Sequence, residues 1–255
     1  MSELFNRVIP CLLLQDGGLV KTSRFRRPRY VGDPINAIRI FNDKYVDELV
    51  LLDINASRIG ADPDYDLITR VAGECFMPLC YGGGIRSLGQ ARRIVASGVE
   101  KIAVNSMSID SPRLIAELSQ EFGASSVVAA IDVKRDLLGR ERVYHPGRRR
   151  STALHPVEHA RALVALGAGE VFLNSVDRDG RYCGFDVDLI ARMASAVTVP
   201  VIACGGASTL EDMRAAIDAG ASAAAAGSIF VFYGPHRAVL INYPDYPSVR
   251  RLFQS

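Results

Sequence analysis

The sequence predicts one domain, residues 1–255, with the fold of a (β/α)8 barrel (TIM barrel) built by half-barrel internal duplication. The first reason is that short apolar runs alternate with amphipathic helical stretches along the whole chain, and no composition shift or linker divides it. Fully apolar runs are typical of parallel strands covered on both faces. The second reason is a stretch that occurs twice. An open doubly wound sheet is the alternative, but eight strand–helix units in about 250 residues, with duplicated halves, favour a closed barrel.

The repeated stretch is residues 82–106 and residues 204–228. Each copy has an apolar run that ends in a glycine pair, an amphipathic helix, and a second apolar run that ends in a serine, and 122 positions separate Ser106 from Ser228. Backbone N–H groups at such turns bind anions. The copies therefore predict two phosphate sites on one face, although glycine pairs can also serve only to allow tight turns.

The elements follow in order from these patterns. Asp33-Pro34 and Asp62-Pro63 each begin a helix, with Asp as the N-cap and Pro in the first turn. Ser87 and Thr209 are the N-cap residues expected for the repeated helix. We expect strands at residues 8–14, 48–54, 78–81, 101–105, 126–132, 170–175, 199–204 and 222–227. We expect helices at about 33–44, 62–73, 87–97, 112–122, 155–166, 186–197, 209–218 and 247–253.

Two polar segments interrupt the alternation. Residues 134–152 are too long for a simple connection and predict a flap or a small hairpin. Residues 21–29 form a long basic loop, which is either a solvated flap or a lid that steers anions. Because the loop follows the first strand, it lies above the barrel mouth, which favours the lid and makes Lys21 its best anion-binding candidate.

Composition excludes several classes of protein. The net charge of +2 is less basic than expected of a nucleic-acid-binding protein. The five scattered cysteines contain no C-x-x-C pair, so we expect no metal site and no cofactor, and such thiols suit a reducing cytoplasm. The first 30 residues lack the pattern of a signal peptide, and no apolar run reaches the ~18 residues that cross a bilayer. We therefore expect a cytoplasmic protein with neither nucleic acid nor membrane as a partner.

The chemistry should lie at the carboxyl ends of the strands. Asp132 ends the fifth strand, and a carboxyl group at a mostly apolar mouth should have a raised pKa and transfer protons near neutral pH. A structural aspartate that caps a loop or pairs with Lys134 is the alternative. The first strand occupies the equivalent place in the other half, and it carries Leu13 where the fifth strand has Asp132. Cys204 is expected to be a packed thiol, and the pair His155 and His159 is expected on the surface at a helix start.

Together these motifs resemble the cyclase subunit of imidazole glycerol phosphate synthase, the HisF family, over almost the whole chain. The matching segments are RVIPCL, DG at 16–17, Lys21, GDP at 32–34, ELVLLDI, GGGI, KIAVNS, VVAAIDVKR, GAGEVFL, SVDRDG, VIACGGA and GS at 227–228. The resemblance implies that one substrate phosphate contacts Gly84, Asn105 and Ser106. It implies that the other contacts Asp179, Gly180, Gly206, Gly227 and Ser228.

The resemblance also implies an ammonia route. Ammonia from a HisH-like glutaminase, docked at the amino-terminal face as a heterodimer, would enter through a ring of charges formed by Arg7, Glu48, Lys101 and Glu170. Buried charges are costly, so a structural role alone is the weaker explanation for four of them.

Four mouth positions depart from the usual family residues: Asn55, Tyr81, Asn174 and Cys204. In addition, Leu13 replaces one of the two carboxylates that the family uses as general acid and base. The residues of the tail also differ, and the chain looks like the HisF-like paralogues of surface-polysaccharide synthesis. That resemblance implies ammonia delivery, with a separate amidotransferase, for an acetamidino (amidine) group on a nucleotide sugar in O-antigen biosynthesis.

Three functions remain open from the sequence. The favoured one is an ammonia-dependent synthase subunit acting on a phosphorylated small molecule or nucleotide sugar. The second is genuine imidazole glycerol phosphate synthase activity in histidine biosynthesis, with Asp132 working alone. The third is a non-catalytic subunit that docks and activates the glutaminase.

Overall fold

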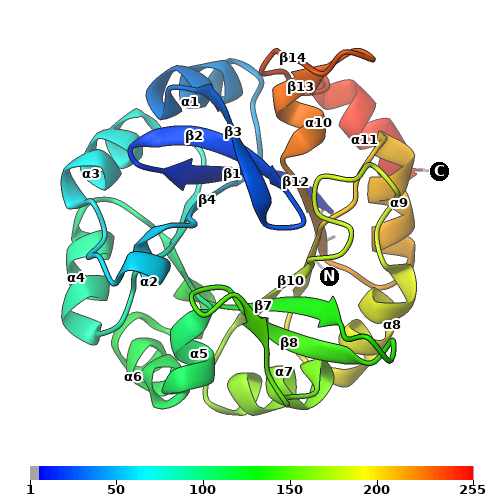
Figure 1. Ribbon diagram of the computed structural model, residues 1–255. Helices are drawn as coiled ribbons and strands as arrows, with labels where there is room; N and C mark the ends of the chain where they lie inside the picture. The colour runs from blue at the N-terminus through cyan, green and yellow to red at the C-terminus, as the bar shows by residue number, and fades with distance from the viewer. Residues whose placement is uncertain (1–5, 255) are drawn as a thin grey trace.

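The chain folds as a closed barrel of parallel strands surrounded by helices (Figure 1). The computed structural model describes residues 6–254. Met1–Phe5 and Ser255 lie outside the described residues. They include both ends of the predicted domain and the first residues of the segment that was tested for a signal peptide. Within the described part, eight strands close the barrel. They are β1 (Arg7–Gln15), β4 (Leu49–Asp53), β5 (Leu79–Gly82), β6 (Lys101–Val104), β7 (Val127–Arg135), β10 (Glu170–Ser175), β11 (Val201–Cys204) and β12 (Ala223–Ala226).

The pairing confirms the barrel and rules out the open sheet. Each strand pairs in parallel with its neighbour along the chain, and β12 pairs with β1, where Arg7 lies opposite Ala223 and Pro10 opposite Ala226. The outer helices are α1 (Pro34–Asp43), α3 (Tyr65–Glu74), α4 (Leu88–Ala96), α6 (Arg113–Phe122), α7 (Pro156–Ala165), α8 (Val187–Ala196), α9 (Leu210–Asp218) and α11 (Tyr246–Gln254).

The helix starts follow from their caps. The Asp33 carboxylate accepts a hydrogen bond from the N–H of Asn36, and Ser87 caps α4 in the same way. Thr209 and Asp212 form a reciprocal capping box at α9. The predicted start at Asp62 is two residues early, because Asp64 is the residue whose side chain caps α3. A cap satisfies N–H groups that the helix cannot pair internally, so these side chains fix where each helix begins.

Strand alternation separates two apolar layers. Inward-facing residues such as Ile9, Val50 and Cys80 fill the barrel, whereas their neighbours pack outward beneath the helices. Tyr81 belongs to the outer layer with Leu67, so its predicted place at the barrel mouth is wrong. The physical reason is the period of two: if Cys80 points into the barrel, Tyr81 must point out.

Both polar segments are hairpins that extend barrel strands. The basic loop forms β2 (Gly18–Ser23) and β3 (Arg26–Gly32), which continue β1 as an antiparallel hairpin. The predicted flap forms β8 (Glu141–His145), antiparallel to β7, and β9 (Arg150–Ser151). Both hairpins lie across one end of the barrel in Figure 1.

The remaining short elements are η1 (Ala124–Ser126), the helices α2 (Ala56–Ile59), α5 (Ser106–Asp110) and α10 (Ser228–Val231), and the hairpin of β13 (Phe232–Tyr233) and β14 (Ala238–Val239). Among the described residues no helix is long and apolar enough to span a membrane.

Candidate functional site

A cavity of about 290 Å³ opens at the carboxyl ends of the strands, beneath the two hairpins. Asp132 and Asn105 lie in its wall, and Phe25 and Tyr144 enter the wall from the hairpins. The ring of Phe25 meets that of Tyr144 edge-on, with centroids 5.8 Å apart. A barrel mouth is where this fold places its chemistry, so this cavity is the candidate active site.

Asp132 is held by two amides at the centre of this cavity. Asn105 Nδ2 donates to one carboxylate oxygen at 2.8 Å, and Asn174 Nδ2 donates to the other at 3.1 Å. Burial raises the pKa of Asp132 to about 7, although both amide hydrogen bonds act to lower it. The predicted rise in the pKa is therefore confirmed, and the carboxyl group can give or take a proton near neutral pH.

The alternative pairing of Asp132 with Lys134 does not occur. Lys134 Nζ instead lies 5.3 Å from the centroid of the Tyr144 ring. The two clamping amides leave acceptors unused, because Asn105 Oδ1 and Asn174 Oδ1 are buried without a hydrogen-bond partner among the described residues. Asn174 therefore contacts the catalytic candidate Asp132 directly. The sequence indicated only that Asn174 differs from the usual family residue.

The first predicted phosphate turn lines the cavity. Gly84, Asn105 and Ser106 all lie in its wall, and the Ser106 hydroxyl is buried without a partner in the described structure. Gly83 has a φ of +125°, and a Cβ there would lie 2.4 Å from the carbonyl oxygen of Asp53. Only glycine fits this close approach. The Gly84 N–H is already engaged, since it donates to Ser57 Oγ at 3.2 Å.

The second predicted turn lies behind the cavity wall. Gly206, Gly227 and Ser228 are buried, and a Cβ at Gly206 would lie 2.1 Å from the carbonyl oxygen of Gly184. Tyr182 covers this turn, because its hydroxyl donates to the Ser228 carbonyl oxygen at 3.2 Å. The two turns therefore differ: the first lines the cavity, whereas the second is buried beside it and contacts Tyr182.

Lys21 joins the second turn to the cavity. Its Nζ donates to Asp179 Oδ1 at 3.0 Å, and both side chains lie in the cavity wall. Burial lowers the pKa of Lys21, but the charge and hydrogen bond of Asp179, together with the neighbouring Cys11 and Cys204, raise it by more, so the net shift is upward and Lys21 is a cation at neutral pH. Gly180 packs directly beneath the hairpin, where a Cβ would lie 2.3 Å from the carbonyl oxygen of Thr22.

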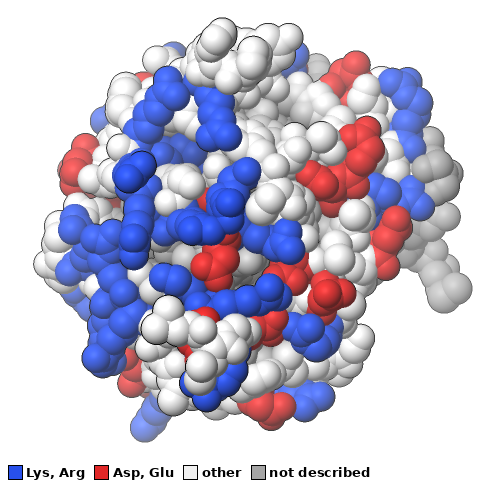
Figure 2. All heavy atoms as spheres, turned by 45° about the vertical axis from the view of Figure 1, so that its right-hand side comes forward, with Lys and Arg blue, Asp and Glu red and all other residues white. Residues whose placement is uncertain are grey.

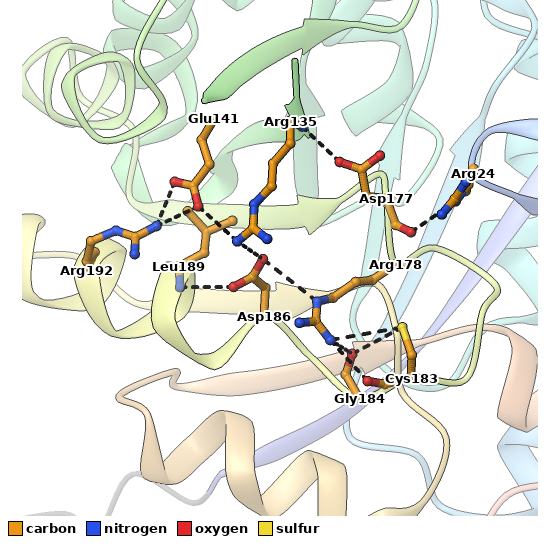
Figure 3. Close-up of polar contacts among 10 residues, drawn as sticks. All are labelled: Arg24, Arg135, Glu141, Asp177, Arg178, Cys183, Gly184, Asp186, Leu189 and Arg192. Carbon is orange, nitrogen blue, oxygen red and sulfur yellow. Dashed lines mark hydrogen bonds and ion pairs between the residues drawn. The ribbon is translucent and has the colours of Figure 1, made fainter. Parts of the chain in front are cut away.

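In the SVDRDG motif, two residues hold the loop in place (Figure 3) and a third reaches the cavity wall. Asp177 accepts from the N–H of Arg135 at 2.8 Å, and Arg178 donates to the carbonyl oxygens of Cys183 and Gly184 at 3.0 and 3.1 Å. These contacts brace the loop between β10 and α8. Asp179 is the acidic residue of the motif that reaches the cavity wall.

The four predicted floor charges converge at the opposite end of the barrel. Arg7 contacts Glu48, and its Nη2 lies 2.6 Å from Glu170; Lys101 Nζ lies 3.0 Å from Glu48 and 2.9 Å from Glu170. Both glutamates are buried, whereas Lys101 keeps 20% of its side chain exposed. Burial lowers the pKa of Lys101, but the charges of Glu170 and Glu48 reverse this and give a net rise. The result is a closed ring of alternating charge.

Part of the cavity wall is apolar. Cys11, Leu13 and Cys204 lie there, and the contact with Cys11, together with burial, keeps the pKa of the Cys204 thiol well above its ordinary value. Such a thiol is a poor nucleophile, in agreement with a packed residue. The expectation for the histidines is half wrong: His155 is exposed, but His159 is buried and its Nε2 lies 3.4 Å from Ser108 Oγ, because it faces inward on α7.

Comparison with known proteins identifies the family. A family model described as "Histidine biosynthesis protein" matches residues 7–236. A protein of Pseudomonas aeruginosa named "Putative imidazole glycerol phosphate synthase subunit hisF2" is 55% identical over 94% of this chain and 96% of its own length. The chain belongs to the HisF family. The "Imidazole glycerol phosphate synthase subunit HisF" of Exiguobacterium sibiricum is 41% identical, over 89% of this chain and 91% of its own.

Within this HisF-family barrel, sequence reasoning missed part of the cavity wall. Phe25, Tyr144 and Arg149 line the cavity from hairpins that the sequence marks only as polar segments. The run Arg148-Arg149-Arg150 was the available signal. Tyr182 was also missed, because nothing in its neighbourhood distinguishes a residue that covers a turn from one exposed to solvent.

Proposed function

We propose that this HisF-family subunit uses ammonia supplied by a HisH-like glutaminase to form an amidine on a nucleotide sugar, as part of surface-polysaccharide (O-antigen) synthesis. The observation that carries the proposal is the contrast between the two barrel ends. The floor has a closed ring of four charges. At the mouth, Leu13 occupies the position equivalent to Asp132, and the other carboxyl groups of the cavity wall are already engaged, Asp179 by Lys21 and Asp53 by backbone N–H groups. Ammonia entry is thus provided for, but the second acid or base is not.

The interior supports a route for ammonia. Directly above the ring, the charges of Glu48 and Glu170 help burial to raise the pKa of the Cys80 thiol. The lining toward the mouth is apolar, and it includes the short side chains of Ala103 and Ala225 beside larger ones such as Phe172. A small neutral molecule crosses such a lining without leaving charged groups unpaired. We therefore assign Arg7, Glu48, Lys101 and Glu170 as the ammonia gate.

The floor also offers a place for a partner. Tyr45 and Phe76 are 81% and 84% exposed in helix-to-strand loops, which end at the amino-terminal face of the barrel. These loops are neighbours, because the Phe76 N–H donates to Asn42 Oδ1 at 3.1 Å. Exposed aromatic residues are typical anchors of protein interfaces. We place the glutaminase here, opposite the substrate cavity.

In the cavity, Asp132 is the proposed catalytic residue. Its pKa of about 7 lets it protonate a leaving oxygen or accept a proton from attacking ammonia. We assign one substrate phosphate to Gly84, Asn105 and Ser106. We assign a second anion to Lys21, Asp179, Gly180, Gly206, Gly227 and Ser228, beside the contact of Tyr182 with the Ser228 carbonyl oxygen.

Imidazole glycerol phosphate synthesis is the second candidate. The relative from Exiguobacterium sibiricum that carries that name covers most of this chain, and Asp132 provides one of the two carboxyl groups. Without a carboxylate at Leu13, loss of the partner predicts a rate lower by about 10²–10⁴-fold.

The test is a nitrogen-transfer assay. The purified chain is mixed with the glutaminase encoded beside it, the separate amidotransferase, glutamine labelled with ¹⁵N at the side-chain amide, an acetamido nucleotide sugar, and ATP with Mg²⁺ to activate the amide oxygen that leaves. Label in an amidine product supports the proposal. Label in imidazole glycerol phosphate at a normal enzymatic rate, when the histidine-pathway substrate is supplied instead, contradicts it and favours the second candidate. Label in neither product also contradicts it.

A further inference from the structure

Arginine residues are concentrated on the two hairpins that cross the mouth. Besides Arg140 and Arg142, which pair with Asp136, the hairpins together carry seven more: Arg24, Arg26, Arg27, Arg29, Arg148, Arg149 and Arg150. In Figure 2 Lys and Arg side chains surround the hollow on one face of the molecule. Because the whole chain has a net charge of only +2, this is a local excess.

Few of these charges are neutralised within the protein. Arg148 pairs with Asp110 at 2.6 Å. Arg24 and Arg29 donate to backbone carbonyl oxygens instead. In the part of the chain that the structure describes, none of the six arginines other than Arg148 forms an ion pair with a carboxylate. These exposed guanidinium groups are therefore available to an anion from outside the chain.

The two hairpins bring cations together around Tyr144, which lies in the cavity wall. Arg149 comes from the second hairpin and reaches the first, where Nη2 donates to the Phe25 carbonyl oxygen at 3.5 Å. Arg26 comes from the first hairpin, and the charges of both arginines act on the Tyr144 hydroxyl. Lys134 lies over the ring of the same tyrosine. Three cations thus gather around one aromatic residue whose side chain also lines the cavity.

Like charges held together in this way repel each other, and an anion with several negative oxygens relieves the repulsion. The planar guanidinium fork matches phosphate oxygens in pairs. The glycine turns lie deeper in the barrel and use backbone N–H groups, so these arginines are a separate site farther out. A ligand that reaches both must be elongated, with one end in the cavity and a multiply charged group at its entrance.

We propose that Arg26, Arg27, Arg149 and Arg150, here called the arginine rim, bind the diphosphate of a nucleoside diphosphate-linked substrate whose sugar enters the cavity beside Asp132. This rests on the proposed function and narrows its substrate class. The four side chains are exposed, so the interaction is screened by salt.

The experiment is calorimetric titration of the full chain with uridine diphosphate and, separately, with inorganic phosphate, at low and high salt. Replacing Arg26 and Arg149 by serine should weaken uridine diphosphate binding by about tenfold or more and reduce its salt dependence. Arg27→Ser with Arg150→Ser should act in the same direction, and the side chains of these two residues form no hydrogen bond, ion pair or ring contact within the described chain. Inorganic phosphate, bound at the glycine turn, should be unaffected.

The matched control is Arg70→Ser with Arg113→Ser, which removes two exposed charges from the outer helices α3 and α6. It should leave uridine diphosphate binding unchanged. Equal weakening by the control and rim variants would mean that only net charge matters, and failure of the parent chain to bind uridine diphosphate would overturn the rim assignment. Neither result bears on nitrogen transfer: a rim that binds normally while no labelled amidine forms would instead reject the proposed function.

Discussion

Replacing Asp132 by asparagine should make the protein's stability less dependent on pH. The folded-state pKa of about 7 exceeds the ordinary 3.8 by about 3 units, and each unit corresponds to about 1.36 kcal/mol. Because the folded state binds this proton more tightly than the unfolded state, Asp132 costs the parent no stability below about pH 4. The cost grows as the pH rises toward 7 and then levels off at about 4 kcal/mol. The asparagine side chain of the variant does not ionise and carries no such cost.

The measurement is the free energy of unfolding in urea at pH 5, 6, 7 and 8. The difference between Asp132→Asn and the parent should shift in favour of the variant by about 1.4 kcal/mol per pH unit up to pH 7. Asp136→Asn is the control. Hydrogen bonds from Arg140 help to lower the pKa of Asp136 below 3.8 against the opposing effect of burial, so its difference should stay constant over this range. Parallel curves for Asp132→Asn and the parent would refute a raised pKa and, with it, proton transfer by Asp132 near neutral pH.

Three further predictions concern the two ends of the barrel. Leu13→Asp should raise ammonia-dependent activity on the histidine-pathway substrate, by up to about 10²–10⁴-fold; an unchanged rate measured with ammonium salt would argue against the missing-carboxylate explanation. Lys101→Ala leaves Glu170 with Arg7 alone, and it should alter glutamine-dependent nitrogen transfer more than activity with free ammonium; equal effects on both would count against the gate. Tyr182→Ala removes the hydrogen bond to the Ser228 carbonyl, and calorimetry should then show tighter binding of a bisphosphorylated sugar, whereas unchanged affinity would mean that Tyr182 does not cover an anion site.

The barrel could be predicted because its signals are local and repeated. Each strand is an apolar run, and caps such as Asp33 and Thr209 mark where helices begin. The turn at Gly83 could also be predicted, since its close approach to Asp53 admits no side chain. The raised pKa of Asp132 followed from burial at a strand end, which the apolar run itself indicates.

The parts that could not be predicted depend on contacts between distant segments. Asn174 and Asn105 clamp Asp132 from β10 and from the turn after β6, and no spacing in the sequence relates them. Tyr182 covers Ser228 across 46 positions. The predicted place of Tyr81 was wrong for a different reason. Side chains alternate inward and outward along a strand, and because Cys80 points into the barrel, Tyr81 points out of it.

The duplication accounts for how the mouth is built. In each half of the chain an equivalent barrel strand, β1 or β7, continues directly into an antiparallel hairpin, β2–β3 or β8. Both hairpins carry arginines, so the proposed diphosphate site is formed by two equivalent hairpins, one from each half of the chain. The strands beneath them have diverged, with Leu13 in one and Asp132 in the other. A ligand held symmetrically at the rim would thus meet Asp132 on one side and Leu13 on the other, which would fix the side on which its reacting group must lie.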